Sequence, residues 1–154
     1  MFSQTAEYAL RAAVWLAQAG NQPLTTAVIA ERARIPKDYL AKILKQMGDA
    51  KLVRCMRGIN GGCVLARPAA EISLLDVIDA VDPIHRIEHC PLGLAEHREN
   101  LCPLHRRLDK SLATVRAALA ESSLRKLSLE SQPGPPLCEP KSQLAAKRRR
   151  TKRK

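Results

Sequence analysis

The chain has 154 residues, 26 of them basic and 15 acidic, and carries a formal net charge of +11 with only four aromatic side chains. This length suits one domain with a hydrophobic core and excludes two large domains. The apolar residues are mostly Ala, Leu, Val and Ile, which favours packed helices over a β-sandwich. The sequence shows no secretory signal and no apolar run of about 18 residues, so we expect a cytoplasmic protein with no membrane partner.

The positive charge is concentrated at the C-terminal end. Residues 145–154 contain seven Lys or Arg and no acid, and the rest of the chain has 19 basic and 15 acidic residues, a net charge of +4. The prolines of residues 133–136 and this run of like charge predict a disordered tail over residues 131–154. Such a tail either attracts a polyanion or simply aids solubility. Cys138 lies within it and has no expected partner.

The first three expected elements are helices. Residues 4–19 carry an apolar stripe at helical spacing, and Gly20 is suited to end that helix. Thr25 or Thr26 can cap a short second helix, whose expected buried face comprises Val28, Ile29 and Ala33. A third helix follows the break at residues 35–36 and spans residues 37–51. Its expected inward residues are Leu40, Ile43, Leu44 and Met47, and its expected outward residues are Lys37, Asp38, Ala41, Lys42 and Lys45.

This order resembles a helix-turn-helix, in which the last helix has an apolar face for its own domain and a polar face for the major groove. A plain helix pair in a bundle is the alternative. The next segment favours DNA binding, because residues 52–56 and 63–66 read as two strands around a Gly-rich turn. A hairpin here is the wing of a winged helix, with Arg57 at its tip suited to a minor groove. Cys55 and Cys63 would face each other in one register, although buried packing is the simpler interpretation.

Two further helices are expected. Ser73 can cap one that runs to Val81 and ends before Pro83. Another starts at Arg107 and carries an apolar stripe formed by Leu108, Leu112, Val115, Ala118 and Leu119. A domain this small offers little to cover that stripe, so we expect a second copy of the chain to bury it in a homodimer. Packing onto its own domain is the alternative.

Residues 90–105 contain four potential metal ligands, Cys90, His97, Cys102 and His105, in the spacing C-x6-H-x4-C-x2-H. Thiolate and imidazole bind iron, zinc and copper well. The spacing is compatible with a zinc ion, with a [2Fe–2S] cluster of mixed ligation, or with a reversible Cys90–Cys102 disulfide and no metal. It is also compatible with two buried cysteines that bind nothing. Paired carboxylates, a nucleophile elbow and a phosphate-binding glycine loop are missing from the sequence, which argues against an enzyme.

Several segments together resemble the Rrf family of bacterial winged helix-turn-helix regulators, which includes iron–sulfur and nitric-oxide-responsive members. The resemblance covers roughly residues 1–130. It rests on AEYALRA at 6–12, IAERARIPKDYL at 29–40, the wing LVRCMRGINGGCVLARP at 52–68, ISLLDVIDAVD at 72–82 and CPLH at 102–105.

The resemblance implies a homodimer joined by the long helix, with the cysteine loop near the interface. Cluster-binding members carry three cysteines in this loop; here Cys90 and Cys102 fit, and His97 stands near the place of the third. His105 lies where some relatives use a histidine ligand, and Glu7 where others supply a carboxylate from the partner subunit. The DNA-contacting residues carried over are Thr25 and Thr26 to phosphate, Lys37, Asp38, Tyr39 and Lys42 in the major groove, and Arg57 and Asn60 near the minor groove.

The sequence therefore predicts a mainly α-helical protein with a winged helix-turn-helix domain, a short β-hairpin wing and a long C-terminal dimerisation helix. We expect a DNA-binding domain over residues 1–82, a sensor loop over 83–106, a dimerisation helix over 107–130 and the basic tail over 131–154. The expected function is transcriptional regulation, more often repression, through an operator affinity that responds to a [2Fe–2S] cluster or a redox signal. A cofactor-free thiol switch and a structural zinc site are the alternatives.

Overall fold

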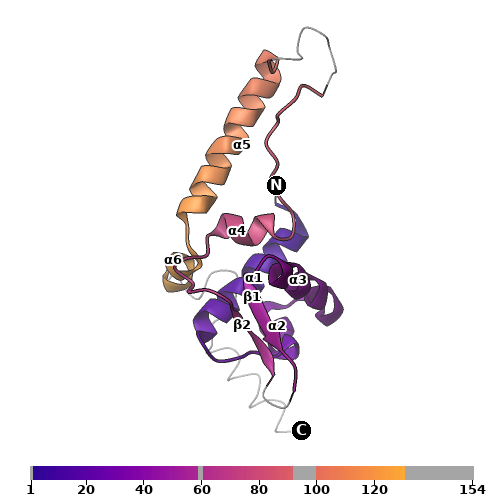
Figure 1. Ribbon diagram of the computed structural model, residues 1–154, viewed down its shortest axis with the longest axis vertical. Helices are drawn as coiled ribbons and strands as arrows, with labels where there is room; N and C mark the ends of the chain where they lie inside the picture. Colours follow the sequence, from indigo (N-terminus) through magenta and orange to yellow (C-terminus); the bar gives the residue numbers. More distant parts are fainter. Residues whose placement is uncertain (1, 59–60, 92–99, 131–154) are drawn as a thin grey trace, which may run out of the picture.

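The computed structural model describes residues 2–58, 61–91 and 100–130. The predictions for Asn60, His97, Cys138 and the basic tail fall outside these residues. In chain order the elements are α1 (Gln4–Ala19), α2 (Thr26–Ala33), α3 (Lys37–Asp49), β1 (Val53–Met56), β2 (Gly62–Leu65), α4 (Leu74–Asp79), α5 (Pro103–Glu121) and α6 (Leu124–Leu129). Figure 1 shows α1–α4, the hairpin and α6 gathered at one end, which we call the head, and α5 with the linker beside it, residues 82–91, projecting as an arm.

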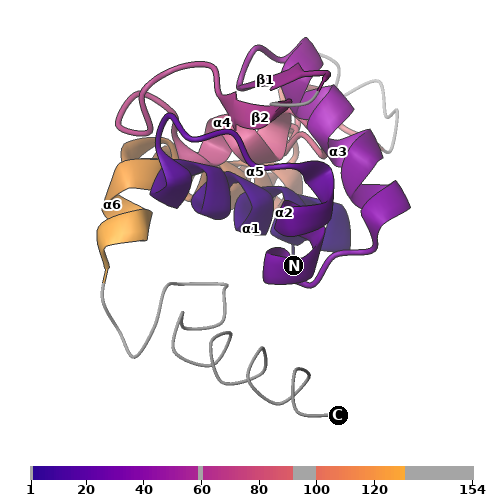
Figure 2. The same ribbon diagram turned by 90° about the horizontal axis from the view of Figure 1, so that it is seen from below.

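Helix α1 is the centre of the head and contacts α2, α3, α4, α6 and β2. Seen from below, it lies between α6 on one side and α3 on the other (Figure 2). The side chain of Ser3 caps its start by accepting a hydrogen bond from the Ala6 amide, and Gly20 ends it with φ 60°. Four of its buried residues are alanines, whose small side chains let the neighbouring helices approach closely. The predicted first helix is confirmed at both ends.

Helices α2 and α3 form the predicted helix-turn-helix. Thr25 caps α2 by accepting from the Val28 amide, and Arg34 ends it in the left-handed conformation with φ 55°. Ile35 in the turn is buried, which anchors the turn to the core. Of the expected inward residues of α2, Val28 is only half-buried, and Ala30 takes its place in the core. The inward face of α3 is confirmed, since Leu40, Ile43, Leu44 and Met47 are buried.

Strands β1 and β2 pair in an antiparallel hairpin, with Val53 opposite Leu65 and Cys55 opposite Cys63. Strand β2 also contacts the chain just before α2, because the Cys63 amide donates to Leu24 O at 2.8 Å and the Leu24 amide donates to Cys63 O at 3.1 Å. Gly62 is required there, since a Cβ would come within 2.9 Å of the Leu24 carbonyl. The simpler expectation for the two wing cysteines is wrong, because Cys55 and Cys63 form a disulfide and Cys55 is exposed.

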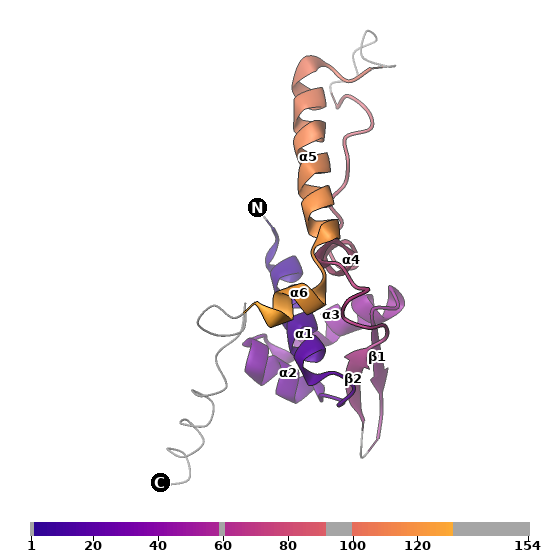
Figure 3. The same cartoon turned by 90° about the vertical axis from the view of Figure 1, so that its left-hand side faces the viewer.

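The C-terminal helix differs from its prediction in two ways. It begins at Pro103 rather than Arg107, with Cys102 as its N-cap residue, because proline is well suited to a first helical turn. It also ends at Glu121, and a second helix, α6, starts after Ser123, whose side chain accepts from the Lys126 amide. Serine hydroxyls compete with helical hydrogen bonds, which explains the break. Figure 3 shows α6 turning from the end of α5 toward α1.

The head and the arm differ sharply in burial. Among the described residues, every buried apolar side chain except Cys102 belongs to the head. Helix α5 buries none of its own residues, and Leu104, Leu108 and Val115 are among the exposed large apolar side chains. In contrast, α6 places Leu124 fully in the core of the head. Within the described residues the apolar stripe of the arm is therefore only partly covered, because Leu112 and Leu119 are half-buried while Leu108 and Val115 are exposed. The shorter helix after it is anchored in the core.

Candidate DNA interface and Cys/His site

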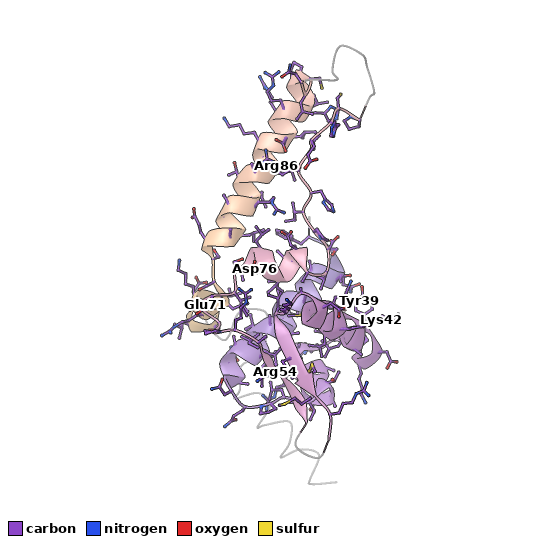
Figure 4. All side chains as sticks on the ribbon, in the orientation of Figure 1. Tyr39, Lys42, Arg54, Glu71, Asp76 and Arg86 are labelled. Carbon is purple, nitrogen blue, oxygen red and sulfur yellow. A yellow bond between two sulfur atoms is a disulfide. The ribbon has the colours of Figure 1, made fainter. Side chains whose placement is uncertain are left out.

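The outward face of α3 carries the side chains expected to contact DNA. Lys37, Asp38 and Lys42 are exposed, and Figure 4 shows Tyr39 and Lys42 on the outer side of this helix. The Tyr39 hydroxyl lies 2.5 Å from the Thr5 hydroxyl, and its ring packs edge-to-face on Tyr8 with centroids 5.8 Å apart. Tyr39 is therefore positioned by α1, although 39 % of it remains exposed.

The other predicted DNA contacts lie at the start of α2 and in the wing. Thr25 is exposed and Thr26 half-buried, and the hydroxyl of Thr25 already accepts from the Val28 amide. Arg57 is exposed just beyond β1. Arg54, on β1, is a further exposed basic side chain that sequence reasoning missed (Figure 4). Side chains along a strand alternate between its two faces, so the residue that follows the buried Val53 is expected to point outward. This alternation is the signal that could have indicated Arg54.

The start of α5 brings three of the predicted metal ligands together. The Nδ1 atom of His105 lies 3.1 Å from Cys102 Sγ and 3.6 Å from Cys90 Sγ. All three potential ligand atoms lie within 4.8 Å of one another. Cys102 and His105 are three residues apart at a helix start, a spacing that places both on one face. Cys90 comes from the linker, so tertiary structure completes the group.

One Asp–Arg ion pair and hydrogen bonds to the linker backbone hold the linker against α5, and a second ion pair joins α5 to α4. The Arg86 guanidinium forms two hydrogen bonds to Asp109, which also accepts from the Ile87 amide at 3.0 Å. Farther along α5, Arg116 pairs with Asp79 at 3.0 Å and donates to the Ile84 carbonyl. Figure 4 shows Arg86 between the linker and the helix. These contacts carry Cys90 to Cys102, and sequence reasoning missed them because the partners are 23 and 37 residues apart.

Three arm residues have pKa values shifted by their hydrogen-bond partners. The pKa of the Cys102 thiol is lowered, chiefly because the His105 backbone amide donates to its sulfur. Thiolate is the form that ligates metal and reacts with disulfides. The side-chain hydrogen bonds of Arg86 lower the pKa of Asp109, and the pKa of Arg86 is correspondingly raised.

The donor set is chemically suited to a metal, and its size can be compared with known ligand distances. Metal–sulfur and metal–nitrogen bonds of ordinary length place tetrahedral ligand atoms about 3.5–3.8 Å apart. The two Sγ–Nδ1 distances, 3.1 and 3.6 Å, are close to that separation.

Glu7 is not in this group in a single chain and instead pairs with Arg11 on its own helix. In the described parts, no helix is long and apolar enough to cross a membrane.

A helix-turn-helix followed by a wing, with an exposed basic helix, defines a DNA-binding regulator of the winged-helix class. Solved structures of this class superpose on the chain. CymR, the global cysteine regulator of B. subtilis, gives a TM-score of 0.69 at 24 % identity, covering 86 % of this chain and 98 % of that one. IscR of T. potens gives a TM-score of 0.70 at 22 % identity, covering 86 % and 88 %.

The sequence comparisons give the family. The model of the Rrf2 family, described as iron-dependent transcriptional regulators, matches residues 2–130. A protein of Mycobacterium tuberculosis named as an HTH-type transcriptional regulator is 36 % identical over 124 residues, 79 % of this chain and 77 % of the relative. The chain belongs to the Rrf2 family and is a transcriptional regulator, not an enzyme. The predicted fold class and family are confirmed.

Proposed function

We propose that the chain is a DNA-binding repressor whose operator affinity responds to a metal group held by Cys90, Cys102 and His105. The observation that carries the proposal is the convergence of the three donor atoms within 4.8 Å at the start of α5. The description of the family as iron-dependent supports iron as the metal. When bound, iron would give this end of the arm a redox-active centre.

A [2Fe–2S] cluster is the first candidate and a single metal ion the second. A cluster needs four ligands, and two of the three donors here are the thiolates that such clusters favour. His97 or Glu7 of the partner subunit would complete the set. The compactness of the donor group favours the second candidate, because ligands of one iron or zinc ion lie closer together than ligands on separate irons. Without metal, Cys90 and Cys102 would form a thiol switch.

The arm is connected to the DNA-binding head at the C-terminal end of α5, whereas the Cys/His site lies at its N-terminal end. Where α5 meets α6, the Leu74 amide donates to Ser122 O at 2.8 Å and the Leu124 amide donates to Ile72 O at 2.9 Å. Leu124 then packs in the core beside α1. A shift of α5 is thereby passed to the head through backbone hydrogen bonds and a buried side chain. A difference of a few kcal/mol between two states is enough to switch operator occupancy.

In a homodimer, a shift of α5 would change the spacing of the two α3 helices that contact DNA. The exposed apolar side chains Leu104, Leu108 and Val115 on α5 would pack against the same helix of a second copy, setting the spacing of two α3 helices. Lys37, Asp38, Tyr39 and Lys42 would then enter successive major grooves. Thr25 and Thr26 would meet phosphate, and Arg57 and Asn60 would reach the minor groove.

The test is anaerobic purification of the full chain, followed by visible absorption and assays of iron, acid-labile sulfide and zinc. Iron with sulfide supports the cluster, and one metal ion per chain without sulfide supports the single-ion site. Cys102→Ser should lose the metal, and Cys138→Ser, outside the described residues, is the matched control. Duplex DNA selected from a random pool by the metal-loaded protein then serves as the binding probe. Unchanged affinity and regulation in Cys102→Ser would contradict the proposal.

A further inference from the structure

The wing contains a second cysteine site that the proposed function does not use. Cys55 and Cys63 lie on neighbouring strands and form a disulfide, with Cα atoms 4.0 Å apart. Cys63 directs both its amide and its carbonyl to Leu24. Those groups therefore point away from Cys55, which makes the two cysteines a non-hydrogen-bonded pair, the position in an antiparallel sheet where facing side chains come closest. The sheet itself thus holds the two sulfurs in bonding distance.

The two cysteines differ in exposure and in what holds their strands. Cys63 is 3 % exposed and belongs to the core, whereas Cys55 is exposed. Through the two Leu24 hydrogen bonds, β2 is attached to the residue just before Thr25, the cap of α2. Strand β1 has its only buried residue at Val53, and the other three residues of the strand are exposed. The disulfide consequently joins the loosely held strand to the firmly held one.

We propose that Cys55 and Cys63 are a reversible thiol–disulfide site that takes a dithiol reductant, and that its state controls how firmly the wing is held for DNA binding. This inference uses the winged-helix function of the family and does not depend on the Cys90 site. Arg57 lies two residues beyond Cys55 and is exposed. A two-stranded hairpin is only marginally stable by itself, so the outer wing depends on the bond between its strands.

Reduction of the wing disulfide proceeds by two thiol–disulfide exchange steps, and the dithiol supplies the two electrons. A thiolate of the dithiol attacks Sγ of Cys55, the exposed cysteine, and forms a mixed disulfide. The Cys55–Cys63 bond breaks, and its electron pair leaves on Cys63, which takes up a proton. The second thiolate of the reductant displaces Cys55, which also takes up a proton. Two electrons and two protons pass to the wing, and the reductant becomes a disulfide; an oxidised dithiol reverses the exchange. Exposed disulfides are the ones that such exchange reaches.

The experiment uses the full chain with Cys90, Cys102 and Cys138 replaced by Ser, so that only the wing pair remains. The protein is equilibrated with reduced or oxidised dithiothreitol under native conditions, and maleimide labels are counted by mass. We expect no label on the oxidised form and two on the reduced form. Hydrogen exchange over residues 53–58 should accelerate on reduction. Binding of a fluorescent duplex selected from a random pool should weaken by about fivefold or more.

The matched control is the same chain with Cys90→Ser, Cys102→Ser and Cys138→Ser that also carries Cys55→Ser and Cys63→Ser, and its wing exchange and duplex affinity should not change with dithiothreitol. A wing disulfide that is reduced only after unfolding would overturn the proposal. Reduction with no change in wing exchange or affinity would overturn it too, as would a control that responds equally. If the native chain also binds no duplex, the DNA-binding function fails; if only the variant fails to bind, the loss of the Cys90 site is the cause. In both cases the labelling and exchange results still decide the wing site.

Discussion

The head and the arm use different interactions to hold their shape. The head is organised around α1, and nearly all the buried apolar side chains of the described residues belong to it. The arm buries only Cys102; one ion pair attaches its linker to α5, and a second ion pair joins α5 to α4. Each region also contains one cysteine pair, joined as a disulfide in the wing and placed around His105 in the arm.

The difference indicates which region can respond to a signal. Burial of apolar surface is the main stabilising term in a fold, so the head is stable through its own packing. Exposed ion pairs contribute little and are weakened by salt, so the conformation of the arm depends more on what binds it. Burial thus makes the packed core of the head the constant part of this regulator, and leaves the arm and the exposed residues of β1 as the parts that can respond.

The largest expected effect separates the two regions by core packing. Leu124→Ala removes a fully buried side chain from the head and should lower the free energy of unfolding by about 2–5 kcal/mol. Leu108→Ala on the arm, where the residue is 47 % exposed, should change the stability of a single chain by no more than about 0.5 kcal/mol. Chemical denaturation measures both. In the proposed homodimer the loss for Leu108→Ala should be larger and should depend on protein concentration, because the side chain would then lie in the interface. A large loss that does not depend on concentration would contradict the division between head and arm.

The next effect concerns the wing disulfide. Cys55 and Cys63 are separated by 8 positions, and closing a loop of that size stabilises the fold by about 2–3 kcal/mol through the unfolded state. Reduction should lower the free energy of unfolding of the native chain by that amount, and its denaturation midpoint should fall accordingly. Cys55→Ser should have the lower midpoint already and should not respond to the reductant. Equal midpoints with and without reductant in the native chain would show that the wing unfolds separately from the head.

A smaller effect is expected at the cap of α4. Ser73 and Asp76 form a reciprocal capping box at the junction of head and arm. Ser73→Ala should cost about 1 kcal/mol, because the Asp76 amide loses its partner. Ser111→Ala on α5, where the hydroxyl donates to the Arg107 carbonyl within the helix, is the matched arm variant and should be nearly neutral. Thermal unfolding compares the two, and equal losses would contradict the assignment of the cap.

The smallest effect concerns the ion pair that holds the linker. Arg86 lowers the pKa of Asp109 in the folded chain. A carboxyl with a depressed folded pKa stabilises the structure above its unfolded pKa, and this contribution is lost as pH falls through the folded pKa. The protection of the amides of residues 84–90 against hydrogen exchange, after correction for the intrinsic pH dependence of exchange, should therefore fall in acid, below about pH 4. Asp109→Asn should exchange rapidly already at neutral pH and lose the acid dependence; an unchanged acid dependence would exclude Asp109 as its cause.

Much of the head and part of the arm site could be predicted from local sequence. The apolar period of residues 4–19, the inward face of α3 and the Ser73 cap appear as predicted, because each depends on residues within two or three turns. The pairing of Cys102 with His105 is also local, since helical spacing brings them together. The start of α5 at Pro103 was missed because the apolar stripe used to place the helix begins only at Leu108.

The sequence by itself therefore determined the helices, the hairpin, the family and the residue types of the two cysteine sites. Tertiary structure alone decided which cysteine meets which partner. Cys55 meets Cys63 because Leu24 takes the hydrogen bonds on the other side of β2, and Cys90 reaches Cys102 because Arg86 and Arg116 hold the linker on α5. Helical and strand periods act over a few residues, whereas these contacts join segments that only folding brings together.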